Sequence, residues 1–226
     1  MREIVLDTET TGLNYMGGDR IIEVGCIELI NHTPTGKNLQ FYCSTNRKIS
    51  EDAIKIHGLT NEFLKKHPAL KEHLKNFFDF IKNDTLIIHN AEFDVGFINN
   101  ELKLVGVKPI TNRVVDTMLL ARKKLNARIT NLNHLCRRFS IDTSSRKLHG
   151  ALLDCHLLAG VYLELLGGKQ TSLNLSEFKK NNTRLTNKTQ ANNRNINKVK
   201  LTKEEIQSHK ELVKGIKKAL WHKLDY

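Results

Sequence analysis

Three short segments of this chain carry acidic side chains at points where an apolar run breaks or a helix begins: Asp7-Thr8-Glu9, residues 89–94 ending in Asp94, and residues 149–154 ending in Asp154. If the fold gathers their carboxylates beside His149, the acids repel one another strongly unless a cation lies among them. Carboxylate oxygens are the ligands that hard divalent cations prefer. The pattern therefore predicts a phosphoryl-transfer site that depends on magnesium or manganese.

The spacing within each segment predicts how the side chains project. Asp7 and Glu9 are two residues apart on an expected strand, so they point to the same side. Such a pair beside a buried apolar run is costly unless it binds something. Asp94 falls in the first turn of an expected helix, where the helix dipole alone would favour a carboxylate. His149 and Asp154 would lie ~140° apart on one helix, so we expect Asp154 inside a helix and His149 on the loop before it. There the histidine has the reach of a general base.

Hydrophobic periodicity predicts an α/β fold with a mixed sheet. Apolar or alternating stretches indicate three strands at 3–7, 20–30 and 37–44, which form an antiparallel meander. Strands and helices then alternate, which favours a sheet with helices packed on it. The expected later elements are a helix over 69–81, a strand over 85–89, a helix from the N-cap Asn90 to Gly106, a strand over 113–115, and helices over 117–125, 132–139 and 151–166.

The three segments together resemble the DEDDh family of 3′→5′ exonucleases, in order and in residue type. Asp7-Thr8-Glu9-Thr10-Thr11-Gly12 corresponds to the first motif of the family, 89–94 to the second and 149–154 to the third. The resemblance covers residues 1–168 and implies a ribonuclease-H-like mixed sheet flanked by helices. It also implies two divalent metal ions, Mg²⁺ or Mn²⁺, held by Asp7, Glu9, Asp94 and Asp154, with His149 as the general base.

Within that family, the resemblance is strongest to the epsilon subunits, the proofreading exonucleases of bacterial DNA polymerase III. His57-Gly58-Leu59-Thr60 matches a segment that lies near the terminal nucleotide in those proteins. The resemblance implies that the frayed 3′ end of DNA is surrounded by six residues: Thr10, Leu13, His57, His89, Asn90 and Phe93. Leu13 and Phe93 suit stacking on an unpaired base.

The composition changes after Gly168. Gln170, Leu173 and Leu175 resemble a sliding-clamp-binding motif, in which an extended segment places apolar side chains into pockets. Residues 181–197 contain seven asparagines and few apolar residues, which predicts a flexible linker within 169–200. Thr202 to Glu205 has capping-box spacing and begins a helical segment over 201–226. By the same resemblance, this segment docks on the polymerase alpha-type subunit.

Charge and composition limit the other readings. The chain carries a net charge of +12, divided as +4 over residues 1–169 and +8 over residues 170–226. The basic tail therefore has a second interpretation, non-specific attraction to DNA. No apolar run is long enough to span a bilayer, and residues 1–7 lack the long apolar stretch and cleavage site typical of a signal peptide. The four cysteines show no metal-binding spacing. We therefore expect a cytoplasmic protein.

Two alternatives to a polymerase subunit remain. The first is a stand-alone RNA 3′-trimming exoribonuclease of the same superfamily, which has no need of a clamp motif and a docking helix. The second is a non-catalytic adaptor between clamp and polymerase, which has no reason to retain mutually repelling acids.

Overall fold

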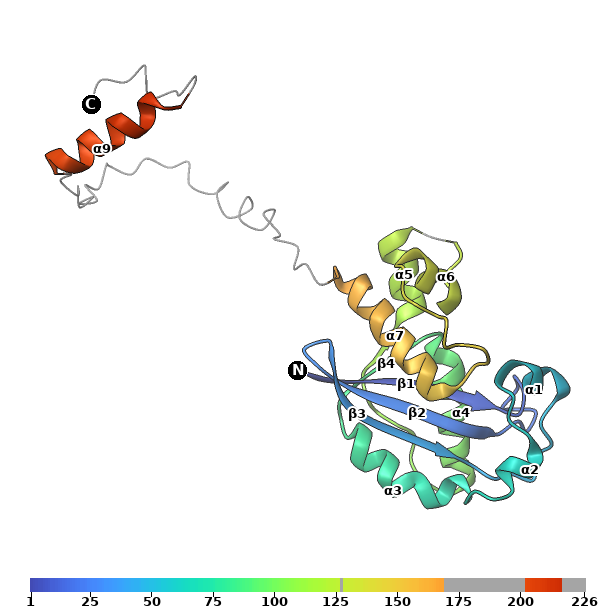
Figure 1. Ribbon diagram of the computed structural model, residues 1–226. Helices are drawn as coiled ribbons and strands as arrows, with labels where there is room; N and C mark the ends of the chain where they lie inside the picture. Colours follow the sequence, from blue (N-terminus) through green and yellow to red (C-terminus); the bar gives the residue numbers. More distant parts are fainter. Residues whose placement is uncertain (127, 169–201, 217–226) are drawn as a thin grey trace, which may run out of the picture. The chain divides into compact units, whose positions relative to one another are not determined.

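A five-stranded mixed sheet forms the centre of the larger of two compact units, Met1–Leu173 and Asn174–Tyr226. The computed structural model describes residues 1–126, 128–168 and 202–216. Strand order is β3-β2-β1-β4-β5, with β1 to β3 antiparallel and β4 and β5 parallel to β1 (Figure 1). This confirms the predicted mixed sheet. The strands are β1 (Arg2–Thr10), β2 (Ile21–Ile30), β3 (Thr33–Tyr42), β4 (Thr85–Ile88) and β5 (Val114–Asp116).

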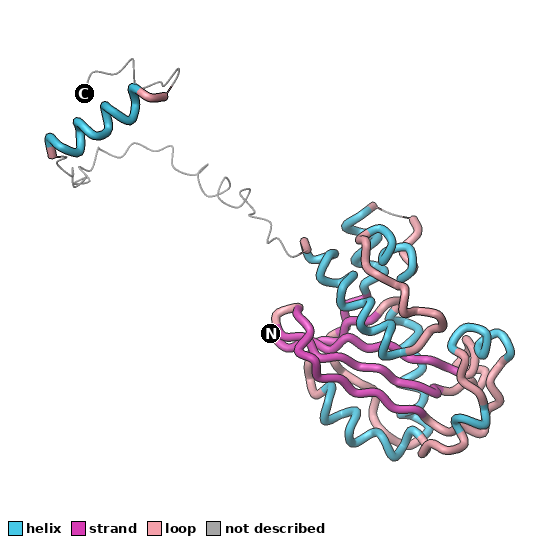
Figure 2. Tube along the Cα trace, viewed as in Figure 1, coloured by secondary structure: helices cyan, strands magenta, loops and turns pink. Residues whose placement is uncertain are grey.

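Helices cover both faces of the sheet (Figure 2). One core contains Ile4 and Leu6 of β1 and the apolar faces of α3 and α4. The other contains Val5 of β1 and the apolar residues of α5, α6 and α7. The helices are α1 (Glu51–His57), α2 (Asn61–Leu64), α3 (Leu70–Ile81), α4 (Ala91–Leu104), α5 (Thr117–Leu125), α6 (Leu132–Arg138) and α7 (Ala151–Leu166).

Alternation along β1 decides which face carries the first two acids. Because Val5 packs toward α7, Asp7 and Glu9 project from that same face as the central strand ends. Asp7 lies opposite Gly25 of β2, and Glu9 lies opposite Glu23.

The first turn of α7 rests directly on the backbone of β2. A Cβ atom at Gly25 would lie 2.4 Å from the carbonyl carbon of Ala151 and 2.5 Å from the nitrogen of Leu152. No other residue type can occupy this position without pushing the helix away from the sheet. Since Gly25 is paired with Asp7, the close approach brings the start of α7 beside the carboxylates of β1.

Some element boundaries differ from the predictions. β1 continues past residue 7 to Thr10, because the polar residues at its end still pair with β2. β3 runs from Thr33 to Tyr42, whereas the predicted strand covered residues 37–44. The first residues of β3 were missed because they are exposed and show no apolar alternation. Helix α1 was not predicted, although Ser50 caps its first turn and Gly58 ends it with φ of 74°. Asn90 occupies the N-cap position of α4 in a left-handed conformation, and its side chain makes no capping bond.

The second unit contains one described helix, α9 (Lys203–Lys214). The predicted capping box is confirmed: the Thr202 hydroxyl accepts from the backbone N–H of Glu205, and the Glu205 carboxylate accepts from the backbone N–H of Thr202. The four cysteines are free and buried. Among the described helices, none is both long and apolar enough to cross a membrane.

Candidate active site

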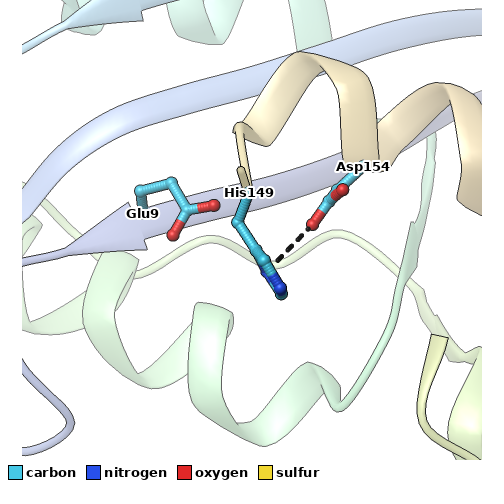
Figure 3. A group of neighbouring side chains, drawn as sticks. All are labelled: Glu9, His149 and Asp154. Carbon is cyan, nitrogen blue, oxygen red and sulfur yellow. Dashed lines mark ion pairs between the residues drawn. The ribbon is translucent and has the colours of Figure 1, made fainter. Parts of the chain in front are cut away.

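Carboxylates from both ends of the chain's larger unit meet at the end of β1 (Figure 3). Ligand atoms of Glu9, His149 and Asp154 all lie within 4.8 Å of one another. Asp154 is in the first turn of α7, and His149 directly precedes its N-cap, Gly150. Glu9 and Asp154 are buried, whereas the side chain of His149 is 42% exposed. The imidazole therefore has access to solvent, while the acids are shielded from it.

Asp94 approaches from the helix on the other face of the sheet. Its Oδ1 atom accepts hydrogen bonds from the backbone N–H of Thr8 (3.0 Å) and from the Thr8 hydroxyl (2.7 Å). Thr8 lies between Asp7 and Glu9 on β1, so these two bonds hold α4 against the acidic end of that strand. The structure thus brings together all four acids and the histidine that the sequence singled out.

Burial and neighbouring charges raise the pKa values of three of these acids, Asp7, Glu9 and Asp94. The pKa of Asp7 lies well above its ordinary value, because of burial and then the charges of Asp94, Glu9 and Asp154. Burial, with the charges of Asp154 and Glu23, raises the pKa of Glu9 from 4.5 to about 8. Burial also raises the pKa of Asp94 to about 7, against the opposing hydrogen bonds from Thr8. An arrangement of this kind is stabilised by cations.

Arg146 is a cation that the sequence reasoning missed. Its Nε donates to Asp154 Oδ1 at 2.6 Å, and its Nη2 donates to Asp154 Oδ2 and to His149 Nδ1, the latter at 2.9 Å. Nη1 donates to Asn133 at the start of α6. The guanidinium and the Asp154 carboxylate are each only 6% exposed. The fork thus occupies both oxygens of Asp154, and a metal ion at this carboxylate must compete with it.

The same contact sets the protonation of His149. Because Nδ1 accepts from Arg146, the neutral imidazole carries its proton on Nε2. Burial and the charge of Arg146 lower the pKa of His149, which outweighs the opposing effect of Asp154. The ring is therefore neutral at neutral pH, but it can take up a proton at Nδ1 only when the bond from Arg146 opens.

Two further acids lie at helix starts and were also missed. Burial raises the pKa of Glu23, and the nearby backbone N–H groups of Ala151 and Leu152, in the first turn of α7, partly oppose this rise. Asp116 accepts from the N–H of Ala91 at 3.0 Å, and from the first turn of α5 through Met118 at 2.8 Å. An isolated acid within an apolar strand, such as Glu23, is a usable sequence signal, because burying it without partners is costly.

A cleft of about 750 Å³ opens beside Glu9. Its lining includes four of the six residues expected to surround a DNA 3′ end: Thr10, Leu13, His57 and Phe93. Leu13 is 82% exposed at its mouth. His89 and Asn90 are outside this lining; His89 instead bonds the Thr117 hydroxyl through Nδ1 at 2.9 Å. The expected clamp-binding residues Gln170, Leu173 and Leu175 lie outside the described residues.

The donor set fits divalent metal ions. Four carboxylates supply hard oxygen ligands, and the raised pKa values of Asp7, Glu9 and Asp94 show how strongly these ligands lack neutralising charge. Asp7, Glu9, Asp94 and Asp154 are the residues that would hold such ions.

Comparison with known proteins agrees with this geometry. The family model described as Exonuclease (RNase_T) matches residues 4–162. A relative from Rickettsia felis, DNA polymerase III subunit epsilon, is 43% identical over 226 residues, covering 96% of this chain and 98% of the relative. The protein of the same name from Haemophilus influenzae is 39% identical and covers 98% of this chain and 95% of the relative.

Solved structures show the same fold at lower identity. The nuclease domain of 3′hExo, a DEDDh family member bound to rAMP, superposes with a TM-score of 0.65 at 18% identity, covering 73% of this chain and 91% of that one. Exonuclease X, in complex with 5′ overhanging duplex DNA, has a TM-score of 0.59 at 21% identity, covering 73% and 90%.

The raised pKa of Glu9 predicts a pH dependence of stability in chelator. Its folded-state pKa exceeds its unfolded value, so the stabilisation is complete below about pH 4.5 and is lost as pH rises through about 8. Glu9→Gln removes this loss. The variant should unfold at a higher temperature than wild type at high pH, by roughly 2–4 °C per kcal/mol, and lose the advantage near pH 5. Saturating Mn²⁺ should reverse the order. Glu92→Gln, at an exposed acid, is the control, and its melting temperature should follow that of wild type at every pH. If Glu9→Gln also followed wild type at every pH, the raised pKa of Glu9 would be contradicted.

The Arg146 fork predicts a stability cost that depends on metal. In chelator, Arg146→Gln leaves a buried Asp154 charge unpaired and should cost ~3–5 kcal/mol. Excess Mn²⁺ should recover most of this cost, since the ion replaces the guanidinium beside Asp154. Calorimetric titration should also give tighter Mn²⁺ binding to the variant. Lys147→Gln, at the neighbouring exposed cation, is the control. An equal deficit with and without Mn²⁺ would show that the two cations do not compete.

Proposed function

The chain belongs to the exonuclease family, and within it to the epsilon subunits of DNA polymerase III; on this premise, we propose that it removes nucleotides from mispaired or single-stranded DNA 3′ ends, as the proofreading subunit of a replicative polymerase. The observation that carries the proposal is the convergence of Asp7, Glu9, Asp94, Asp154 and His149 beside a cleft that can hold a nucleotide. The products are 5′-mononucleotides.

Each part of the site has a role in this reaction. Two divalent ions, Mg²⁺ or Mn²⁺, would supply the positive charge that stabilises the attacked phosphate. Hydrogen bonds from Thr8 position Asp94, and hydrogen bonds from Arg146 position Asp154. His149, neutral at neutral pH, accepts the proton of the attacking water at Nδ1 once Arg146 releases that atom. Leu13 and Phe93 border the cleft where an unpaired base can stack.

The relatives favour a polymerase subunit over a stand-alone RNA trimmer, and the complete set of four acids with His149 disfavours a non-catalytic adaptor. A stand-alone RNA trimmer would need only the nuclease domain, but the alignment with the Rickettsia felis relative runs over 96% of this chain. We further propose a division into a nuclease domain (1–168), a clamp motif with a linker (169–200) and a polymerase-docking segment (201–226), in a cytoplasmic protein. The exposed Leu212 of α9 (67%) supports a docking role for the last segment.

The nuclease assignment is tested with 3′-labelled single strands and with matched and mismatched duplex ends. Wild type should release mononucleotides only with divalent metal, and faster from mismatched ends, because unpairing there costs least. His149→Ala should lower the rate by ~10²–10⁴-fold and abolish the loss of activity at acidic pH. His156→Ala, exposed on α7, is the control. Full activity in chelator would overturn the assignment.

The docking proposal is tested by removing residues 201–226. The truncated protein should no longer co-purify with the polymerase catalytic subunit, while its activity on free single strands stays nearly unchanged. Leu173→Ala combined with Leu175→Ala should weaken sliding-clamp binding alone. If the truncation instead leaves polymerase association intact and weakens DNA binding in a strongly salt-dependent manner, the tail acts by non-specific attraction to DNA.

A further inference from the structure

The positive charge of the nuclease unit is concentrated in one part of it. Residues 117–147, which comprise α5, α6 and their loops, carry eight Lys and Arg against a single acid, Asp142, a balance of +7. Residues 1–169 as a whole carry only +4. The remainder of that span is therefore net negative, in keeping with its acidic site.

Seven of these eight cations are exposed, and none forms an ion pair with a residue in the described part of the chain. We call these seven residues the basic surface: Arg122, Lys123, Lys124, Arg128, Arg137, Arg138 and Lys147. Five of them lie in the last turns of α5 and α6, where the helix dipole favours a cation. The dipole does not account for Arg128 or Lys147, nor for the absence of acids in the first turns of both helices.

The elements that carry the basic surface adjoin the active site. The eighth cation, Arg146, bridges Asn133 of α6 to Asp154. Thr117, the first residue of α5, bonds His89. The apolar faces of α5 and α6 pack against α7, the helix that holds Asp154. The basic surface is therefore fixed relative to the carboxylates.

DNA needs such a surface because the site itself repels it. Metal ions would neutralise charge at the scissile phosphate, but the next phosphates along the strand would still face the part of the domain outside residues 117–147, which is net negative. We propose that the basic surface binds the backbone phosphates of the DNA strand on the 5′ side of the scissile bond. This proposal rests on the proposed nuclease function and adds the path of the uncleaved strand.

The test compares Lys123→Ala/Arg128→Ala with a matched pair on the opposite face of the sheet, Lys71→Ala/Lys75→Ala, in the full-length chain. The substrates are a nitrophenyl ester of thymidine 5′-monophosphate, which has no 5′ strand, and a single strand of about 12 nucleotides. The first pair should lower kcat/KM several-fold on the strand and leave the ester unchanged. The slope of log KM against log salt concentration should fall by about 1.4, because each of the two lost phosphate contacts contributes ~0.7 to that slope. The control pair should change neither.

Binding of the same strand, measured by fluorescence anisotropy with Glu9→Gln added to each protein, tests the surface without turnover. The proposal would be overturned if Lys123→Ala/Arg128→Ala lowered kcat/KM equally on the ester and the strand, or if the control pair had the same effect. It would also be overturned if Lys123→Ala/Arg128→Ala left the affinity for the strand unchanged. Loss of polymerase co-purification with unchanged strand affinity would assign the basic surface to an acidic protein partner instead. Failure of wild type to cleave either substrate would reject the nuclease function, while the anisotropy would still decide the surface.

Discussion

Mutual repulsion among buried carboxylates is the constraint on which this structure depends. Asp7, Glu9 and Asp94 are held together although burial and neighbouring charge raise the pKa of each. The fold opposes this repulsion locally: Thr8 donates two hydrogen bonds to Asp94, and Arg146 neutralises Asp154. A site built in this way is incomplete in charge, and divalent cations complete it. Repulsion among these carboxylates therefore explains both why the acid cluster is unstable alone and why it suits the metal-dependent chemistry of the family.

Periodicity and residue type made much of the fold predictable. The buried run in β1, the apolar strand β2 and the helical spacing in α3, α4 and α7 all identified their elements, and the order of antiparallel and alternating segments indicated the mixed sheet. The edge strand β3 was placed less well, because an exposed strand needs no alternation. The short α1 was missed because it buries little apolar surface, although its caps at Ser50 and Gly58 were visible.

The candidate site divides in the same way. Its acids and His149 could be found because their residue types sit at segment ends, where chemistry is expected. Arg146 and Asp116 could not, since each acts through contacts made only after folding. Glu23 stands out as an acid within an apolar strand, but its position near the start of α7 could not be predicted. Arg146 lies in a polar loop that offers no periodic signal. The roles of Glu23 and Asp116 depend on backbone N–H groups of helices that lie far from them in the sequence. It is therefore easier to identify the reacting groups from sequence patterns than to identify the groups that position them.

The contact of α7 with Gly25 has a consequence for how this domain tolerates change. Elsewhere α7 packs through side chains that can repack when a neighbour is altered, and volume-conserving exchanges in such cores are mild. At Gly25 the helix meets backbone atoms alone, and no rotamer can adjust there. The distance between Asp7 and the start of α7 is thus insulated from the composition of the surrounding core. Apolar core residues can therefore change while the spacing between Asp7 and the start of α7 is kept, because direct contact between the backbones of β2 and α7 sets that spacing.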